Sequence, residues 1–424
     1  MSKVAVVDVA SAPDSEFSGD KLIRKVSMIL DRAGEVGEPI YVIDSLNRNN
    51  MSATTLQSDG FKTLNKQIRF LNDTCVPAAL YTVKQDLDRR NLSSVVVITP
   101  CHRRTVLQKY QELLFTTLYN FVYINNDRPI SDDSSAGDGA SEEIVQVSDD
   151  VATFVRQLPA IGEISVLQSP LVPGCFSHGF TTRTGGISYI RTLSSLNLFS
   201  SSKRRDPQSV VRENIRRLGL KVGFQPHQFH MVKVDHASDV WVVGDHVPEG
   251  MRYDGMVTNQ ADVVLAAPGA DCMPLLFSDP VAKAIGVAHA GWKGTLMGIA
   301  MATVNAMVSR FGSKPENIVA VIGPSVGDCC FRLDQGSAKE FQSIHPDCVR
   351  EDGTPRPYVN IRLATRVLLE KGGLHSKHIH DDTSTDIPNV TLCTSCHSDM
   401  FFSHVRDGTN FGTQIGFLWI QSEQ

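Results

Sequence analysis

Residues 261–294 read ADVVLAAPGADCMPLLFSDPVAKAIGVAHAGWKG, and this stretch decides how the second half of the chain folds. Two apolar runs in it, Val263–Ala267 and Ala284–Ala288, have the length of buried strands and end at polar or glycine-rich turns. A third such run, Val319–Ile322, follows. Between them Gly294–Phe311 is predicted as one helix, which ends before Gly312 and Pro315. Loops rich in glycine, histidine and cysteine separate these elements, so the chemistry of the protein is expected in this half.

The first 125 residues alternate between strand-like and helix-like segments. Strands are expected at Lys3–Val9, Pro39–Ile43 and Ser94–Thr99, and helices at Asp20–Ala33, Val76–Arg90 and Arg103–Leu118. This alternation predicts a small α/β domain with a parallel sheet over residues 1–125. The strand-to-helix junctions carry neither GxGxxG nor GxxxxGK[ST], so no phosphate-binding loop of these kinds is predicted and the role of this domain stays open.

Residues 126–148, NDRPISDDSSAGDGASEEIVQVS, are rich in aspartate, serine and glycine. Such a composition buries little apolar surface. A flexible linker is therefore expected over residues 126–160, followed by a second domain over 161–424.

Composition excludes several classes of protein. A formal charge of -5 argues against a general nucleic-acid binder, so no nucleic-acid partner is predicted. The apolar runs are far shorter than the ~20 residues of a membrane-spanning helix. No secretory signal is recognisable, and nine cysteines in such a chain favour free thiols over disulfides. We expect a cytoplasmic protein; association with peroxisomes or other organelles cannot be read from the sequence.

Three potential metal ligands stand at the ends of predicted elements: His236 in VKVDHASDV, Cys272 in GADCMPLLF and His289 in VAHAGWKG. Two imidazoles and one thiolate can hold zinc and leave a fourth position for water, whose pKa the metal would lower towards ~7. Core histidines and buried cysteines explain the same residues without a metal. Spacing alone leaves both interpretations open.

A second cysteine motif is Cys393-Thr-Ser-Cys396-His397. A CxxC pair normally needs a second pair of ligands to form a structural zinc site. The nearest candidates in sequence are His378, His380 and His404. Packing or a role in a loop is the competing interpretation.

Two arginines are candidates for binding phosphate. Arg183 in TTRTGGIS lies beside two glycines, so that a guanidinium and exposed backbone N–H groups are available to an anion. Arg406 in SHVRDGTNFG is a similar case. A tight turn with a surface arginine accounts for either motif equally well.

Read in order, the second half closely resembles the YfiH-like family, also named the multicopper polyphenol oxidase or laccase-domain family. The resemblance covers about residues 170–424, and its segments are HGFTTRTGGIS, SLNLFSS, HASDV, DGMVT, ADCMPLLF, AHAGWKGT, GPSVGDCCF and CT followed by FFSHVRDGTNFGTQIGFLW. The chain departs from the usual family pattern at VDHAS, although the histidine is present. The resemblance implies a YfiH-like layered α/β domain whose metal ligands and catalytic residues are His236, Cys272 and His289.

The resemblance also implies zinc-dependent chemistry on purine nucleosides. Adenosine, inosine, guanosine and methylthioadenosine would be cleaved by phosphate, and adenosine would be deaminated to inosine. Arg183 and Arg406 fall in family motifs, and we expect them to position the phosphate. Nucleosides and phosphate are then the expected partners.

Two alternatives remain. The older family name implies copper and phenolic substrates, but oxygen reduction by several coppers needs about ten histidines, often in His-x-His pairs. Here 13 histidines are scattered, and only His378 and His380 have that spacing. The other alternative is a non-enzymatic scaffold that recruits protein partners through its N-terminal domain. A purely structural zinc would be expected to have a fourth protein ligand.

Overall fold

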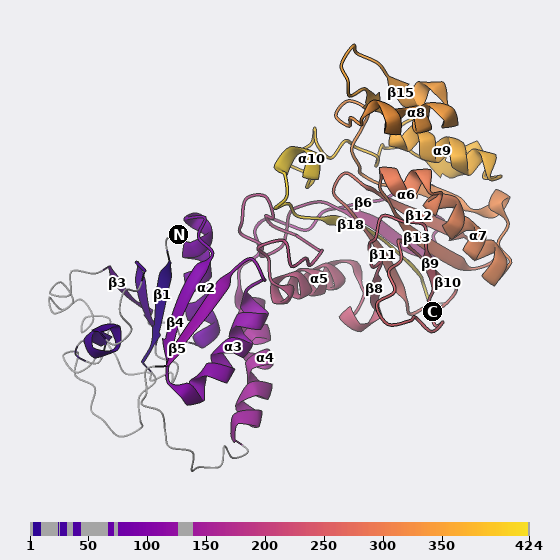
Figure 1. Cartoon of the computed structure of the whole chain (residues 1–424). Coiled ribbons are helices and arrows are strands. Elements are labelled where there is room, and N and C mark those ends of the chain that lie inside the picture. The colour runs from indigo at the N-terminus through magenta and orange to yellow at the C-terminus, as the bar shows by residue number, and fades with distance from the viewer. Residues whose placement is uncertain are drawn as a thin grey trace. The chain divides into compact units, whose positions relative to one another are not determined.

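The computed structural model describes residues 3–9, 24, 26–31, 37–43, 67–71, 75–125 and 139–422. The chain forms two compact units, shown in Figure 1. The first comprises Met1–Leu158 with Ser200–Glu213, and the second comprises Pro159–Phe199 with Asn214–Gln424. The first unit thus includes a segment that lies within the predicted second domain. Arg205 Nη1 binds Asp88 Oδ1 at 2.6 Å and Ser209 Oγ donates to the Leu113 carbonyl at 2.6 Å, which attaches this segment to the first unit.

The first unit contains a five-stranded sheet in which every neighbouring pair is parallel. Its order is β3 (Ile68–Leu71), β2 (Ile40–Ile43), β1 (Val4–Asp8), β4 (Ser94–Thr99) and β5 (Asn120–Asn125). Strands β1 and β2 are buried along their whole length. Continuous apolar runs of this kind are typical of parallel strands covered on both faces, and the predicted parallel sheet is confirmed.

The helices of this unit agree with the predicted ones in two cases. Helix α2 (Val76–Arg89) has a proline in its first turn, where the missing N–H costs no hydrogen bond. Helix α3 (Arg104–Leu114) follows the 3₁₀ turn Cys101–Arg103 and ends earlier than predicted, because Phe115 is extended. Of the predicted helix over residues 20–33, residues 24 and 26–31 are helical, and the rest lies outside the described residues.

Helix α4 (Gly139–Gln157) occupies much of the segment where a flexible linker was predicted. Val147, Val151 and Val155 are buried along one face of it at intervals of four residues. The acidic composition of the segment hides this apolar stripe, so the linker prediction fails over 139–157. Helix α4 packs against α3 (Figure 1). Residues 126–138 of the predicted linker lie outside the described residues.

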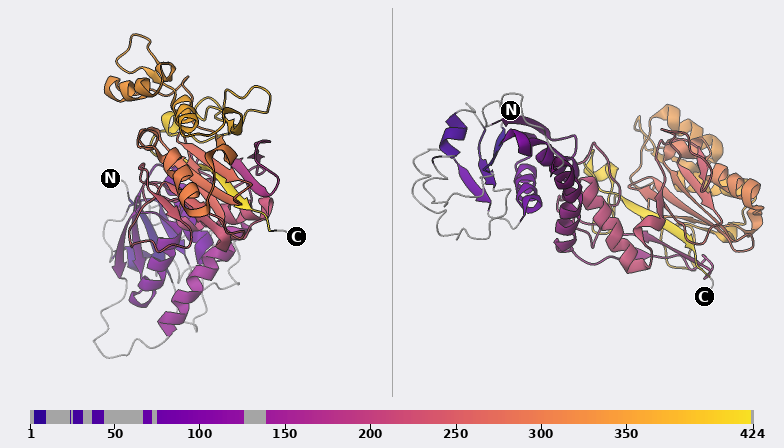
Figure 2. Two further views of the ribbon diagram at one scale, coloured as in Figure 1. Left: turned by 90° about the vertical axis from the view of Figure 1, so that its right-hand side faces the viewer. Right: turned by 90° about the horizontal axis from the view of Figure 1, so that it is seen from below.

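The second unit is built on two sheets. The six-stranded sheet has the order β17 (Ile379–His380), β14 (Val319–Ile322), β12 (Met273–Asp279), β13 (Ala284–Ala290), β10 (Gly255–Thr258) and β9 (Val240–Val242). The five-stranded sheet has the order β6 (Val166–Leu167), β7 (Phe176–Thr181), β18 (Gln414–Ile420), β11 (Val264–Gly269) and β8 (Phe229–Met231). Strand β18, yellow in Figure 2, is the central strand of the second sheet. Strands β11, β13 and β14 confirm the three predicted apolar runs.

Alternation along β12 shows how the layers pack. Met273, Leu275 and Phe277 belong to a core shared with helices, whereas Leu276 faces a core shared with the five-stranded sheet. The six-stranded sheet is therefore buried on both faces. This arrangement confirms the layered α/β fold.

The helices of the second unit flank these sheets. They are α5 (Gln208–Val222, which begins in the first unit), α6 (Trp292–Leu296), α7 (Ile299–Phe311), α8 (Gln335–Ile344), α9 (Ile361–Lys371) and α10 (His404–Asp407). Short 3₁₀ turns lie at Pro226–Gln228, Pro315–Asn317, Pro346–Cys348 and Ser376–His378, and β15 (Val349–Arg350) pairs with β16 (Tyr358–Val359). Among the described residues, no helix combines the length and apolar character needed to cross a bilayer.

The predicted helix Gly294–Phe311 is two helices. Gly298 has a φ of 82°, in the left-handed region, and separates α6 from α7. Helix α7 then packs against β13 and β10 and ends at Gly312, which also has a positive φ. The prediction of a single helix was wrong at Gly298. Because of this break, α6 lies at the edge of the site described next.

Candidate metal centre

The ligand atoms of His236, Cys272 and His289 all lie within 4.8 Å of one another. Strand pairing brings two of them together. Met273 of β12 is opposite Ala290 of β13, so Cys272, just before β12, lies near the end of the strand that carries His289. His236 arrives from the loop between β8 and β9.

Asp254 organises this cluster. It precedes β10 and is fully buried. Its Oδ1 lies 2.8 Å from Nδ1 of His289 and accepts the backbone N–H of His236 at 3.1 Å. Its Oδ2 accepts the N–H groups of Asp235 and Ala237 at 3.0 and 2.9 Å. The hydrogen bond to Nδ1 directs Nε2 of His289 away from Asp254, as is typical of metal-binding histidines, and a metal there would replace the Nε2 proton.

Two residues of the centre have a strained backbone. His236 has a φ of 62° and Asp271 a φ of 92°. Residues other than glycine rarely adopt such values, which cost about 1–3 kcal/mol each. Hydrogen bonds offset this cost, because Asp254 holds the loop of His236. Asp271 accepts from Thr394 Oγ1 and Ser403 Oγ, both at 2.7 Å.

Gly291 lies between the ligands. A Cβ atom there would come within 3.0 Å of Cys272 Sγ and 3.3 Å of His236 Cδ2. Contacts this short would force the ligands to move. Glycine therefore keeps the space at the centre clear.

Electrostatics favour the metal-binding form of the thiol. Burial raises the pKa of Cys272, but the charge of His289 and hydrogen bonds from both histidines lower it to about 6. Burial likewise lowers the pKa of His289, but the Cys272 thiolate and the Asp254 carboxylate raise it to about 9. Burial also raises the pKa of Asp254, while hydrogen bonds from His289 and from backbone N–H groups lower it overall. A thiolate is the form of cysteine that ligates metals.

This donor set fits a metal ion. A thiolate and two imidazoles suit zinc and copper, whereas magnesium and calcium prefer oxygen ligands. Three protein ligands leave one position of a tetrahedral ion open, as in catalytic sites. The site therefore has the composition of a catalytic metal centre.

A pocket of about 670 Å³ opens beside the cluster. His236, Cys272 and Gly291 line it on the side of the cluster. Its wall combines apolar side chains with two guanidinium groups and one further imidazole: Trp292, Val326, Phe331, Leu333, Ile361, Val405, Arg332, Arg356 and His404. A pocket of this size and lining is typical of small-molecule sites.

The two arginines predicted to bind phosphate are engaged elsewhere. Arg183 donates through Nε, Nη1 and Nη2 to the carbonyls of Ser194, Ser398 and Arg191 at 2.7–2.9 Å. Its guanidinium also lies over the ring of Phe402.

Arg406 likewise donates to the carbonyls of Thr394 and Phe401 at 2.9 Å and forms two hydrogen bonds with the carboxylate of Asp407. Neither arginine is among the residues that line the pocket. The structure therefore shows both as connectors of backbone segments, and their assignment to phosphate gains no support from it.

Other residues of the site were missed. Asp254 lies in DGMVT, and its position just before a strand was the available signal. Arg332 and Arg356 lie in no recognisable motif.

The partners predicted for the CxxC motif were wrong. Cys329 and Cys330 lie beside Cys393 and Cys396. His380 is instead buried, with its Nδ1 2.6 Å from Oγ of Ser169.

Comparison with known proteins identifies the family of the chain. Residues 177–421 match the model of the multi-copper polyphenol oxidoreductase laccase family. The chain is 51% identical to purine nucleoside phosphorylase LACC1 of Mus musculus, over 85% of this chain and 84% of that protein. It is 49% identical to the Homo sapiens protein of the same name, over 86% and 85% of the two chains.

Bacterial proteins are similar to the second unit. The crystal structure of YlmD from Geobacillus stearothermophilus shares 29% identity and a TM-score of 0.54, and it matches 62% of this chain and all of that chain. The family match spans more than half of the chain, and the likeness to the Mus musculus relative extends into the N-terminal unit. The chain therefore belongs to the multi-copper polyphenol oxidoreductase laccase family.

Proposed function

We propose that this protein is a zinc-dependent enzyme that cleaves purine nucleosides with phosphate. Adenosine, inosine and guanosine would yield the free base and ribose 1-phosphate, and methylthioadenosine would yield adenine and methylthioribose 1-phosphate. We also propose that the same site deaminates adenosine to inosine. The names of the two mammalian relatives support the first activity, and the deamination rests on the family resemblance together with the open metal position.

One observation carries the proposal: two residues of the ligand cluster, His236 and Cys272, line the same apolar pocket as two guanidinium groups. Trp292, Phe331 and Leu333 offer the apolar surface on which a purine ring packs. The volume of about 670 Å³ suits a nucleoside together with phosphate. A nucleoside is uncharged, so the arginines are available for the anion.

Arg356 is the better candidate for binding phosphate. Arg332 is held by Asp352 and Thr354 and stacks on Tyr358, with 3.6 Å between the guanidinium carbon and the ring centroid. Arg356 is exposed and donates through Nη2 to the carbonyl of Arg332 at 3.2 Å. Its remaining N–H donors would bind the phosphate in the pocket that it lines.

In phosphorolysis, a phosphate oxygen bonds to C1′ of the ribose while the bond from C1′ to the purine nitrogen breaks. The departing purine takes up a proton. His404 lines the pocket from α10 and would donate this proton. Arg356 would hold the phosphate in position for attack, which lowers the entropic part of the barrier.

Bound zinc would supply Lewis acidity and, for deamination, a water of lowered pKa. His236, Cys272 and His289 would hold it. Asp254 would orient two of these ligands rather than exchange protons with the substrate, because both of its oxygens already accept hydrogen bonds. The apolar wall would exclude water from the base.

Oxidation of phenols by copper is the second candidate, because the family description names it. Two clusters of three or more potential ligands occur among the described residues, and only one of them contains histidine. Four-electron oxygen reduction needs several histidine-bound coppers. The side chains therefore favour zinc chemistry.

The role of the N-terminal unit is not part of this chemistry, and we propose that its five-stranded parallel sheet belongs to a domain that contacts protein partners. We propose the cytoplasm as the compartment, because the described cysteines form no disulfide, as is usual in a reducing environment.

The test is to incubate metal-analysed protein with each nucleoside, with and without phosphate, beside Cys272→Ala. Chromatography should show free base that depends on phosphate, and inosine from adenosine that does not. Both products should disappear in the variant. If the protein holds about one zinc at this centre yet forms neither product, the proposal is wrong.

A further inference from the structure

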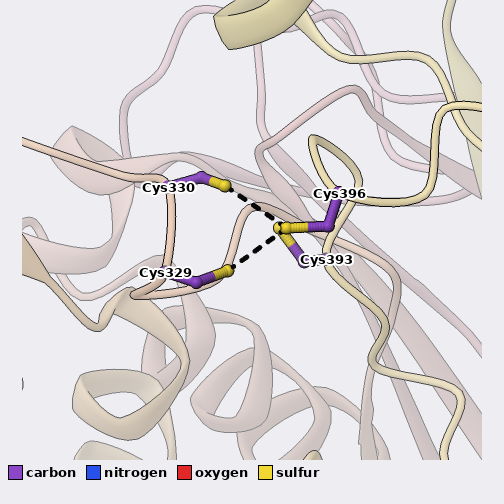
Figure 3. Close-up of side chains that lie close together, drawn as sticks. All are labelled: Cys329, Cys330, Cys393 and Cys396. Atoms are coloured by element: carbon purple, nitrogen blue, oxygen red, sulfur yellow. Dashed lines mark hydrogen bonds between the residues drawn. The ribbon is translucent and has the colours of Figure 1, made fainter.

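Four cysteines from two distant segments meet at one point outside the metal centre described above. Cys329 and Cys330 lie in the turn after β14, and Cys393 and Cys396 lie in the turn before α10; together we call them the four-cysteine cluster. All four Sγ atoms are within 4.8 Å of one another. Figure 3 shows the side chains pointing inward from opposite sides. Sγ of Cys396 lies 3.6 Å from that of Cys329 and 3.4 Å from that of Cys330.

The backbone holds the two segments side by side. Ser325 and Cys393 form a parallel β-bridge, in which Thr394 N donates to the Ser325 carbonyl at 2.9 Å. Behind this bridge the buried Arg362 donates to Ser325 Oγ at 2.9 Å and to the Leu392 carbonyl at 3.0 Å. The cluster is therefore part of the folded framework rather than a chance approach of two loops.

One sulfur atom of the cluster accepts a backbone hydrogen bond. The N–H of Gly327 donates to Sγ of Cys393 at 3.3 Å. A Cβ at Gly327 would lie 3.2 Å from Sγ of Cys329 and 3.5 Å from Cβ of Cys393, so the backbone packs directly against the sulfur atoms. This N–H···S contact stabilises negative charge on the sulfur of Cys393.

We propose that the four-cysteine cluster binds one zinc ion through four thiolate ligands. A tetrahedral zinc with Zn–S bonds of about 2.3 Å places its sulfur atoms about 3.8 Å apart. The distances of 3.4 and 3.6 Å are close to this value. Four thiolates this close repel one another, and a divalent cation removes that repulsion. With four protein ligands the ion has no open position, so its role is structural.

A disulfide explains the cluster less well. A disulfide joins two sulfur atoms at about 2.05 Å and requires only one partner for each cysteine. Sγ of Cys396 is instead nearly equidistant from two other sulfur atoms, and a fourth lies within the same small volume. This convergence is typical of ligands around one ion.

The zinc would hold a wall of the substrate pocket. Cys330 belongs both to the cluster and to the pocket wall, and Phe331 and Arg332 follow it directly. On the other segment Thr394 donates to Asp271, next to the ligand Cys272. One ion would thus connect the wall of the pocket to the base of the metal centre.

Metal analysis of the full-length protein tests the proposal without any assay of activity. Zinc-loaded wild type should hold two equivalents per chain, and Cys272→Ala and Cys396→Ser should each hold one. Cys396→His keeps a possible ligand and should retain more metal than Cys396→Ser. Cys175→Ser is the matched control, because this exposed cysteine lies in neither cluster, and it should hold two.

Cobalt distinguishes the two sites by their spectra. In Cys272→Ala, bound cobalt should show the intense visible bands of a tetrahedral ion and a strong thiolate charge-transfer band in the near ultraviolet. Adding Cys396→Ser should remove both. A wild type that binds one equivalent, all of it lost in Cys272→Ala, would overturn the proposal, as would a disulfide between Cys330 and Cys396 in freshly prepared protein that folds normally. The result does not depend on whether the enzyme acts on purines.

Discussion

Nδ1 of His289 lies 2.8 Å from Oδ1 of Asp254, and the same oxygen accepts the backbone N–H of His236. One buried carboxylate therefore sets the orientation of one candidate metal ligand and the loop conformation of another. Because His236 has a φ of 62°, this loop would relax if the carboxylate were lost.

Asp254→Asn should weaken metal binding by about 10–100-fold, the range found when partners behind metal ligands are removed. An amide presents one acceptor oxygen where the carboxylate presents two, so the hydrogen bonds to His289 and to the 235–237 loop cannot all form. Competition with a chromogenic chelator measures the affinity. Asp245→Asn is the control, because Asp245 pairs with Arg310 on the surface. Equal affinity in the two variants would show that Asp254 does not support the ligands.

Arg183→Ala and Arg356→Ala should have opposite consequences. Loss of Arg183 removes three hydrogen bonds to backbone carbonyls and should lower the free energy of unfolding by roughly 2 kcal/mol or more, with the KM for phosphate little changed. Loss of Arg356 should raise the KM for phosphate about tenfold or more and leave stability nearly unchanged, because its side chain is exposed.

Denaturant titration and phosphate-dependent kinetics on both variants separate these effects. Arg406→Ala should behave like Arg183→Ala, since its guanidinium is also bound to carbonyls and to Asp407. If Arg183→Ala or Arg406→Ala raised the KM for phosphate without lowering stability, these arginines would bind phosphate, as the sequence predicts.

His404→Gln should lower kcat for phosphorolysis by about 10²–10⁴-fold, the usual contribution of a general acid, with a smaller change in nucleoside KM. Glutamine keeps the polarity and approximate size of the side chain but cannot donate a proton in the same way. Metal content should stay at the wild-type level, because His404 is not one of the ligands. A variant with unchanged kcat would remove His404 from the reaction.

Acid should destabilise the second unit through His178. Burial lowers the pKa of His178 from 6.5 to about 4, and its Nε2 accepts the N–H of Ser169 at 2.9 Å. The folded state therefore binds this proton less readily than the unfolded state does. The contribution of neutral His178 to the free energy of unfolding is fully present above pH 6.5. It is lost as the pH falls towards 4, and the total loss is roughly 3 kcal/mol.

Thermal unfolding between pH 7 and pH 4 measures this effect. In His178→Gln the slope of stability against pH should be shallower over this interval, although the variant is less stable at neutral pH. The same slope in both proteins would mean that other groups control the acid transition.

The sequence alone predicted much of the fold. Strands such as Ser94–Thr99 and Val319–Ile322 were predicted at their observed bounds, because continuous apolar runs between polar turns leave few alternatives. Local composition misled at two places: the apolar stripe of α4 lies among acidic residues, and Gly298 divides a helix that looked continuous.

The convergence of His236, Cys272 and His289 could be predicted because all three stand in family motifs. The roles of their neighbours could not. Asp254, Arg356 and the pairing of Cys329 with Cys396 depend on which strands and turns lie side by side, and sequence spacing does not encode that contact.

For Arg183 and Arg406, likewise, the sequence did not determine what each guanidinium binds. A guanidinium beside glycines is equally suited to an anion and to backbone carbonyls, and only the folded chain decides which acceptor lies within reach. The sequence determined which elements form and which side chains can bind a metal, since both follow from local chemistry. The tertiary structure decided which side chains meet, because hydrogen bonds and ligand geometry act over about 3 Å between segments far apart in the chain.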